Sequence, residues 1–226
     1  MWWSDFLNFF FPVLCLVCQK RLPKQGETLC LECEYNLPKT GFNHFLHNPV
    51  SQAFWGRVPV EMATALFRFE KGSAYQKLLH ELKYRNNRAA GIYMGKLLGL
   101  LLLNTPFESC DMLVPVPLHW KRQKKRGYNQ SEVIATGTSQ ITGIPVENHL
   151  LVRSTHHSSQ TSLGRYDRYL NIQGNFSVSS RAPDVNGMKI LIIDDVMTTG
   201  STLEACSLEL KAHYNCLIYI ATISFA

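Results

Sequence analysis

The second half of the chain alternates between apolar runs and segments in which apolar positions recur at helical spacing. The strand-like runs are 112–117, 144–147, 149–153, 189–193 and 217–225. Helical spacing occurs over residues 130–140 and 201–214. The run K-I-L-I-I at 189–193 is continuously apolar, as in a strand covered on both faces. This alternation predicts an α/β fold with a parallel sheet and crossover helices.

The first half has a different pattern. Residues from about 60 to 105 are predicted to be mostly helical, with one apolar face at Tyr75, Leu78, Leu79 and Leu82 and a second helix marked by Ile92, Met94, Leu97 and Leu98. The extreme N-terminus has apolar residues at helical spacing, namely Trp2, Trp3, Phe6, Phe9 and Phe10. We expect an amphipathic helix there. It lacks the marks of a signal peptide and is too short to span a membrane, so we expect a soluble, cytoplasmic protein.

Four of the seven cysteines form two C-x-x-C pairs, Cys15 with Cys18 and Cys30 with Cys33. Two such pairs can supply the four thiolates of a tetrahedral zinc site, and this spacing predicts a structural zinc module. Four ordinary core cysteines and a redox C-x-x-C are the alternatives, but redox chemistry needs only one pair. The other cysteines, Cys110, Cys206 and Cys216, are expected in the core.

Composition narrows the function classes. The hydrophobic fraction of 46% and the charged fraction of 18% are typical of a globular protein. A formal net charge of +6 suits anionic ligands, but it is modest for a dedicated DNA-binding protein.

Five cations stand close together in one short run: Lys121, Arg122, Lys124, Lys125 and Arg126. Such a run is most often a solvated surface. Two functional interpretations stay open beside it. The run could neutralise a pyrophosphate, or it could bind a nucleic-acid backbone, with Trp120 and Tyr128 as stacking candidates.

Two aspartates, Asp194 and Asp195, follow the run K-I-L-I-I, and small hydroxyl residues and a glycine come next. Ser201 and Glu204 have the spacing of a capping box, which would begin the last helix without any ligand. That explanation leaves the aspartates and T-T-G unexplained. A helix N-terminus beyond a parallel strand binds phosphate, and paired carboxylates can accept hydrogen bonds from a diol. Together these features predict a ribose 5-phosphate site.

Rival interpretations of this stretch are weaker. A phospho-receiver domain needs far more chain after its acidic pair, and the chain has no P-loop motif. A plain buried strand end would leave two costly unpaired aspartates.

The stretch L-I-I-D-D-V-M-T-T-G-S-T resembles the phosphoribosyl pyrophosphate motif of type I phosphoribosyltransferases, and the wider chain resembles their ComF family from Cys15 to Phe225. The further marks are the two C-x-x-C pairs, L-K-Y-R (82–85), V-P-V-P (114–117), R-G-Y-N-Q (126–130), and Q-T-S-L with Arg168, Asn171 and Phe176 downstream. The resemblance implies a type I phosphoribosyltransferase-like parallel sheet flanked by helices, with a small N-terminal four-cysteine zinc module.

The resemblance also implies site residues. Asp194 and Asp195 would bind the ribose hydroxyls with Mg²⁺ nearby, and Arg168 would join them as a catalytic residue. The substrate-binding set would be Val116 and Pro117 at the pyrophosphate, together with Asp194, Asp195, Val196, Met197, Thr198, Thr199, Gly200, Ser201 and Thr202. The segment 155–168 matches the position of a mobile loop, where Arg153, Gln160 and Arg168 are expected to matter. His119, His156 and His157 have no identifiable catalytic partner.

Two functions follow from the resemblance. The first is a phosphoribosyltransferase that binds phosphoribosyl pyrophosphate with Mg²⁺ and is associated with DNA uptake in natural transformation. The second is a non-catalytic module that binds single-stranded DNA beside the DNA-uptake proteins. Either function would use three parts of the chain: a zinc module with its amphipathic segment at 1–40, a linker and helical region at 41–108, and a phosphoribosyltransferase-type core at 109–226. The acceptor stays unidentified.

Overall fold

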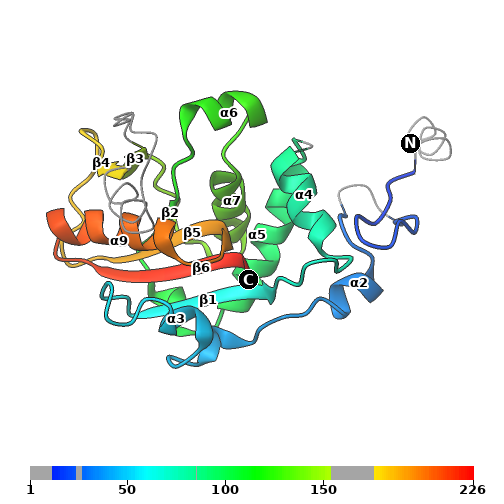
Figure 1. The fold of residues 1–226 in the computed structure, drawn as a ribbon, viewed down its shortest axis with the longest axis horizontal. Helices are drawn as coiled ribbons and strands as arrows, with labels where there is room; N and C mark the ends of the chain where they lie inside the picture. Colours follow the sequence, from blue (N-terminus) through cyan, green and yellow to red (C-terminus); the bar gives the residue numbers. More distant parts are fainter. Residues whose placement is uncertain (1–11, 24–26, 85, 154–175) are drawn as a thin grey trace, which may run out of the picture.

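The computed structural model describes residues 12–23, 27–84, 86–153 and 176–226. Its centre is a sheet in which all neighbouring strands run parallel. From one edge to the other, the order is β1 (Met62–Arg68), β6 (Leu217–Phe225), β5 (Lys189–Met197) and β2 (Met112–Pro115). Figure 1 shows this sheet with helices on both sides. The predicted α/β fold with a parallel sheet is confirmed.

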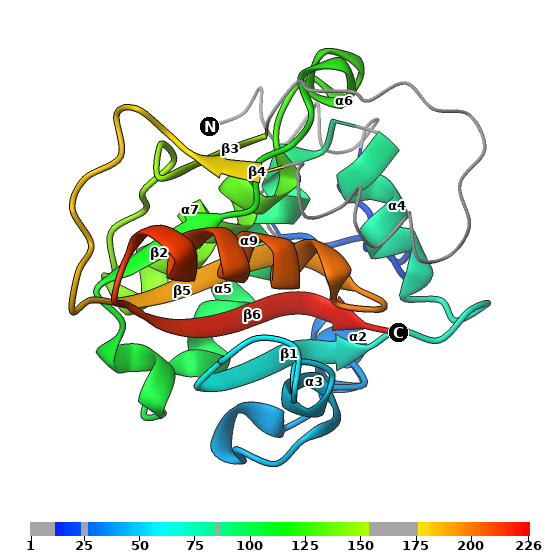
Figure 2. The ribbon, with the colours of Figure 1, turned by 60° about the vertical axis from the view of Figure 1, so that its left-hand side comes forward.

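The two central strands are apolar along their length because both faces of the sheet are covered. Ile190 to Ile193 are all fully buried, but alternate residues enter different cores. Leu191 and Ile193 pack on the side of α5 (Arg88–Leu102) and α7 (Gln130–Thr142). Ile190 and Ile192 pack on the side of α9 (Ser201–His213), which crosses in front of β5 and β6 in Figure 2.

The remaining elements are short. Two strands, β3 (Leu151–Arg153) and β4 (Phe176–Val178), form an antiparallel pair outside the main sheet. The other helical segments are α2 (Leu31–Tyr35), η1 (Phe42–His44), α3 (Pro49–Gln52), α4 (Gln76–Tyr84), η2 (Pro106–Ser109) and α6 (Trp120–Arg126). Among the described residues, no helix combines the length and apolarity needed to cross a membrane. The amphipathic helix expected near Trp2 lies outside the described residues.

The sequence predictions of secondary structure are wrong for residues 62–68 and for residues 144–147. Residues 62–68 form a strand rather than a helix, because M-A-T-A-L-F-R pairs with β6 and is buried on both faces. Residues 144–147 do not form a strand of their own, since only Val146 makes an isolated bridge, to Leu113. The first difference adds a strand to the main sheet, so part of the segment 41–108 lies within it. The three-part division itself stays a prediction.

Helices α5 and α7 pack backbone against backbone at two glycines. A Cβ added at Gly95 would overlap the carbonyl oxygen of Ile134, and one added at Gly137 would overlap that of Ile92. Thr138 fixes the same crossing, since its buried hydroxyl donates to the carbonyl of Gly95 at 3.0 Å. Because neither helix can move aside without breaking this contact, the glycines set where α7 lies against the sheet.

We expect Gly95→Ala to lower the free energy of unfolding by about 2 kcal/mol, because the added methyl has no space and the helices must separate. Lys96→Ala, at the exposed neighbouring position, is the matched control and should change stability by no more than about 0.5 kcal/mol. Urea unfolding of both variants measures this. A Gly95→Ala protein stabilised by about 1 kcal/mol, as helix propensity alone predicts, would contradict the close crossing.

Candidate functional site

The candidate site lies at the carboxyl ends of β2 and β5, and β5 extends beyond the end of β2. β2 pairs with β5 only as far as Ile193, whereas β5 stays paired with β6 through Asp194 and Val196. The prediction that the strand ends before the aspartates is therefore wrong, because β5 continues to Met197. This overhang places Asp194 and Asp195 where open α/β sheets bind their ligands.

Asp194 is held by two hydrogen bonds from different elements. The hydroxyl of Ser131, in α7, donates to its Oδ1 at 2.9 Å, and the backbone N–H of Asp195 donates to the same atom at 2.9 Å. Burial of the carboxyl group and the neighbouring charge of Asp195 raise the pKa of Asp194 to about 7. At neutral pH this side chain therefore gains or loses its proton readily.

Asp195 forms an ion pair with Lys83 of α4, whose Nζ lies 3.2 Å from Oδ2. The two side chains are only 26% and 14% exposed, so solvent screens this pair less than a surface ion pair. The sequence marks L-K-Y-R as a family motif without predicting a role for Lys83. Lys83 reaches Asp195 only because α4 packs beside the end of β5, and no local sequence pattern predicts that packing.

The segment R-G-Y-N-Q (126–130) links α6 to α7 and lies beside the carboxyl ends of β2 and β5. Gly127 ends α6 in the left-handed conformation with φ +78°. Asn129 caps α7, accepting from the Ser131 N–H at 3.1 Å and donating to the carbonyl of Val116 at 3.0 Å. Because Ser131 also holds Asp194, the first turn of α7 connects β2 to β5.

Tyr128 in this segment supports the fold. It is 3% exposed, and its hydroxyl donates to the carbonyl of Leu82 at 2.5 Å. A buried ring offers no open face to a base, so the expectation that Tyr128 stacks on a nucleic acid is corrected. Trp120, the other stacking candidate, is 54% exposed at the start of α6.

The loop from Thr198 to Thr202 turns into α9 around Gly200, which has φ +76°. The hydroxyls of Thr199 and Ser201 lie 2.8 Å apart and hydrogen bond to each other. The loop residues line a hollow of about 40 Å³ that also touches Asp194. The start of a helix favours negative charge, so this hollow suits an anionic group beside the aspartates.

The predicted capping box at the start of α9 is wrong. The N-cap residue is Gly200, and no side chain caps the helix. Glu204 is 2% exposed and turns inward to form an ion pair with Arg57. Arg57 also donates to the carbonyl of Thr199 at 3.0 Å, so it fastens the loop from a segment 142 positions away in sequence. No sequence motif indicates this contact.

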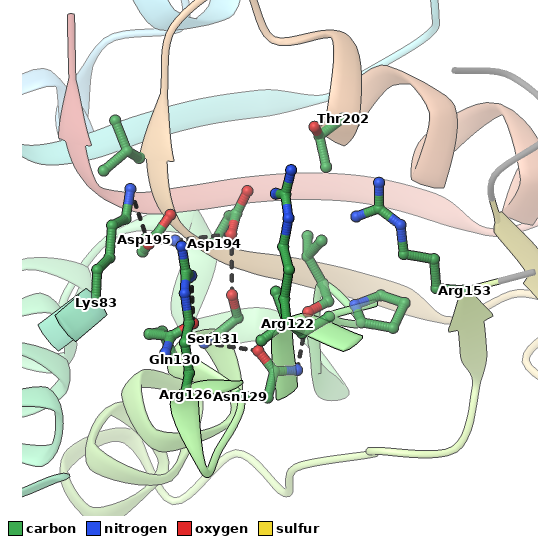
Figure 3. A pocket seen from close by; sticks show the side chains of 14 residues that line it. Lys83, Arg122, Arg126, Asn129, Gln130, Ser131, Arg153, Asp194, Asp195 and Thr202 are labelled. Atoms are coloured by element: carbon green, nitrogen blue, oxygen red, sulfur yellow. Dashed lines mark hydrogen bonds and ion pairs between the residues drawn. The ribbon is translucent and has the colours of Figure 1, made fainter. Parts of the chain in front are cut away.

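A cavity of about 170 Å³ opens between the aspartates and the loop that follows β2 (Figure 3). Val116 and Pro117 line it together with four cationic side chains: Lys83, Arg122, Arg126 and Arg153. Burial and the nearby charge of Arg122 lower the pKa of Arg153. Since four cations face two carboxylates, the lining carries net positive charge and favours a polyanion.

A broader groove of about 650 Å³ continues from this cavity along α6. It shares Lys83, Arg122 and Arg126 with the cavity and adds Lys124 and Lys125. Most of the basic run therefore faces one groove. Lys121 is exposed outside this lining, with its Nζ over the ring of Trp120 at 5.5 Å.

The four N-terminal cysteines are brought together. The sulfurs of Cys15, Cys18, Cys30 and Cys33 all lie within 4.8 Å of one another, and those of Cys18 and Cys30 are 3.6 Å apart. Four thiolates around one zinc lie about 3.8 Å apart when each Zn–S bond is about 2.3 Å. The cluster can therefore hold a metal ion. Cys110, Cys206 and Cys216 are buried in the core, as predicted.

Other expected residues divide into two groups. Arg168, Gln160, His156 and His157 lie outside the described residues, and so does the expected mobile loop. Arg153 lies in the cavity, and His119 caps α6 by accepting from the Lys121 N–H at 3.2 Å.

Comparison with known proteins agrees with this geometry. The phosphoribosyl transferase domain family matches residues 105–225, more than half of the chain. Competence protein F of Haemophilus influenzae is 35% identical over 101 residues, which cover 45% of this chain and 44% of that protein. The chain belongs to the ComF family of the phosphoribosyltransferase superfamily.

Other relatives of this ComF protein match over a similar stretch. DNA utilization protein YhgH of Escherichia coli K12 is 29% identical over 130 residues, covering 56% of each chain. Competence protein ComFC of Bacillus subtilis is 32% identical over 101 residues, covering 43% of this chain and 38% of that one. The match spans about half the length of these relatives.

Among solved structures, the glutamine phosphoribosylpyrophosphate amidotransferase of B. subtilis is similar, with 19% identity and a TM-score of 0.41. The similarity covers 60% of this chain and 26% of that enzyme.

The raised pKa of Asp194 predicts a pH-dependent stability. Between the usual carboxyl pKa near 4 and about 7, the folded protein holds this proton more tightly than the unfolded chain does. Stability should therefore fall as pH rises through that window. Asp194→Asn removes the titrating group and should stabilise the protein by about 2 kcal/mol near pH 8, with the gain vanishing below about pH 4.

Urea unfolding across this pH range measures the difference. Glu70→Gln, at an exposed position, is the control and should follow the wild-type curve. A constant difference between Asp194→Asn and wild type at all pH values would show that the pKa of Asp194 is not raised.

Proposed function

We propose that the chain binds phosphoribosyl pyrophosphate together with Mg²⁺ and transfers the phosphoribosyl group. The observation that supports this is the order of features around β5. An anion hollow at the start of α9, two adjacent carboxylates and a cationic cavity follow one another within a single site. The substrate presents the same order of groups: a 5-phosphate, a diol, and a pyrophosphate on C1.

Each part of the site would act on one part of this ligand. The loop from Thr198 to Thr202 would bind the 5-phosphate through hydroxyl and backbone donors. Asp194 and Asp195 would accept hydrogen bonds from the ribose diol. The cations of the cavity would stabilise the charge that develops on the departing pyrophosphate, and Val116 and Pro117 would shape its binding loop.

The residues also fit a magnesium ion. Mg²⁺ prefers oxygen ligands and retains several of its waters, which suits two adjacent carboxylates beside phosphate oxygens. When bound, the ion supplies charge neutralisation for the pyrophosphate. It would also favour the charged form of Asp194, whose pKa is raised by burial and by the neighbouring charge of Asp195. Arg168 stays a proposed catalytic residue of the segment beyond β3.

A second candidate function is binding of single-stranded DNA. The observation that favours it is the basic groove along α6, which is large enough to take a chain of phosphates. Relatives named for competence and DNA utilization support an association with DNA uptake, where the protein would act in the cytoplasm beside DNA-uptake proteins. The groove and the sugar-phosphate cavity could serve both ligands, since they share three cations.

We also propose that the four cysteines hold a structural zinc. Beyond the fit of their sulfurs, the cluster packs on the body of the protein: Tyr75 donates to the carbonyl of Cys33 at 3.0 Å, and Tyr93 donates to Glu34. Cys15 and Cys33 share a core with Leu78 of α4. Zinc would thus stabilise the surface on which α4 and α5 rest.

Freshly purified protein should contain about one zinc per chain by elemental analysis. Cys15→Ser with Cys33→Ser should lose the metal and unfold at a lower temperature, because structural zinc contributes folding energy. Cys110→Ser is the control for a buried cysteine outside the cluster and should retain the metal. A full zinc content in the double variant would contradict the four-thiolate site.

For the sugar-phosphate site, calorimetric titration with phosphoribosyl pyrophosphate and Mg²⁺ should detect binding to the wild type. Asp194→Asn with Asp195→Asn should weaken it by at least about tenfold, because two charge-assisted hydrogen-bond acceptors are lost. Asp184→Asn, at an exposed position, should bind normally.

The same proteins separate the two candidate functions. Single-stranded DNA should bind the aspartate double variant as it binds the wild type. Lys124→Gln with Lys125→Gln should instead flatten the salt dependence of DNA binding by a slope of about 1.4, with sugar-phosphate binding retained. If the aspartate variant lost DNA binding and kept phosphoribosyl pyrophosphate, the proposed assignment would be reversed.

A further inference from the structure

The loop from Thr198 to Thr202 is contacted by the turn that directly follows α3. In this turn Phe54 is 1% exposed, and a Cβ added at Gly200 would lie only 3.2 Å from Cε1 of its ring. Arg57 reaches both the loop and α9 from the same turn. We propose that Arg57 is a positioning residue for the 5-phosphate, which orients the loop and neutralises Glu204. The inference rests on the proposed sugar-phosphate site and adds a residue from a segment outside it.

The turn is fixed to the free edge of β1, and Figure 2 shows α3 beside this strand. The side-chain amide of Asn48 donates to the carbonyl of Ala63 at 2.9 Å, and the hydroxyl of Ser51 accepts from the Ala63 N–H at 2.9 Å. Arg57 also donates to the carbonyl of Ala53 within the turn at 2.8 Å, so its guanidinium is oriented before any ligand binds. The position of Arg57 is therefore set by the sheet rather than by the loop that it contacts.

The guanidinium of Arg57 fixes one peptide plane of the loop. Its Nη1 donates to the carbonyl of Thr199 at 3.0 Å. In a trans peptide the carbonyl and the next N–H point in opposite directions, so the Gly200 N–H points away from Arg57. Among the described residues, Gly200 belongs to the lining of the anion hollow and Arg57 does not. The contact thus leaves this N–H available to a phosphate oxygen at the start of the helix.

The same side chain neutralises a carboxylate at the start of α9. Glu204 lies in the first turn of this helix, is 2% exposed, and forms its ion pair with Arg57. A helix N-terminus stabilises negative charge, so Glu204 and a bound phosphate would compete for that stabilisation and repel each other. Because Arg57 compensates the charge of Glu204, the N-terminus of α9 stays favourable for the phosphate of the ligand.

Calorimetric titration with two small anions tests the positioning role. Arg57→Ala should weaken the binding of ribose 5-phosphate by about tenfold, because the loop orientation and the charge compensation are both lost. Inorganic pyrophosphate should bind this variant within about twofold of wild type, since Arg57 is not among the residues that line the cationic cavity. Arg181→Ala, at an exposed arginine outside both linings, is the matched control and should bind both anions as wild type does.

A second variant guards against a folding defect. Arg57→Ala removes the cation of a buried ion pair, which is strongly destabilising, whereas Arg57→Ala with Glu204→Gln removes both charges. The double variant should bind ribose 5-phosphate about threefold more weakly than wild type, because the Thr199 carbonyl still lacks its donor. The difference between the single and double variants measures the charge compensation.

Wild-type affinity for ribose 5-phosphate in both Arg57 variants would overturn the inference and leave the sugar-phosphate site intact. An equal loss of affinity for ribose 5-phosphate and for pyrophosphate would also overturn it, because that pattern indicates general damage to the fold. If the wild type binds neither ribose 5-phosphate nor phosphoribosyl pyrophosphate, the proposed function itself fails, and the inference fails with it.

Discussion

The close crossing of α5 and α7 is the constraint on which the site depends. Because Gly95 and Gly137 bring the two backbones into contact, α7 has one position against the sheet. That position puts its first turn between the ends of β2 and β5, where Asn129 and Ser131 reach both strands. A packing contact in the interior thus determines the geometry of polar groups at the surface. The first turn of α7 can hold the side chain of Asp194 through Ser131 only because the crossing with α5 places α7 there.

The site holds groups of like charge close together, which lowers the free energy of unfolding of the protein. Asp194 and Asp195 are adjacent, and only Asp195 has a cation in direct contact among the described residues. Arg122 and Arg153 line the same cavity, and the charge of Arg122 helps to lower the pKa of Arg153. Both arrangements are less stable than alternating charges would be. They become favourable when a ligand brings the opposite charges, which is the usual reason a binding site is less stable than it could be.

The sequence predicts the features that depend on local spacing and leaves out those that depend on tertiary contacts. The two C-x-x-C pairs and the stretch from Asp194 to Thr202 are found from sequence, because the chemistry lies within a few residues. The sequence does not predict β1, because M-A-T-A-L-F-R lacks the alternation of apolar and polar residues that marks a strand. This segment is a strand because it pairs with β6. Lys83, Arg57 and the buried Tyr128 illustrate the same limit: each acts on a partner far away in sequence, so no local pattern predicts it.

The similarity to the phosphoribosyl transferase domain begins at residue 105, but the sheet that supports the site includes β1 at 62–68. Without β1, the edge of β6 would present unpaired backbone groups flanked by apolar side chains, an arrangement that promotes association between chains. The segment that matches the family and the segment that completes the sheet are therefore different, because β1 lies outside residues 105–225. Any transplant of this fold into another protein would have to carry the earlier strand with it.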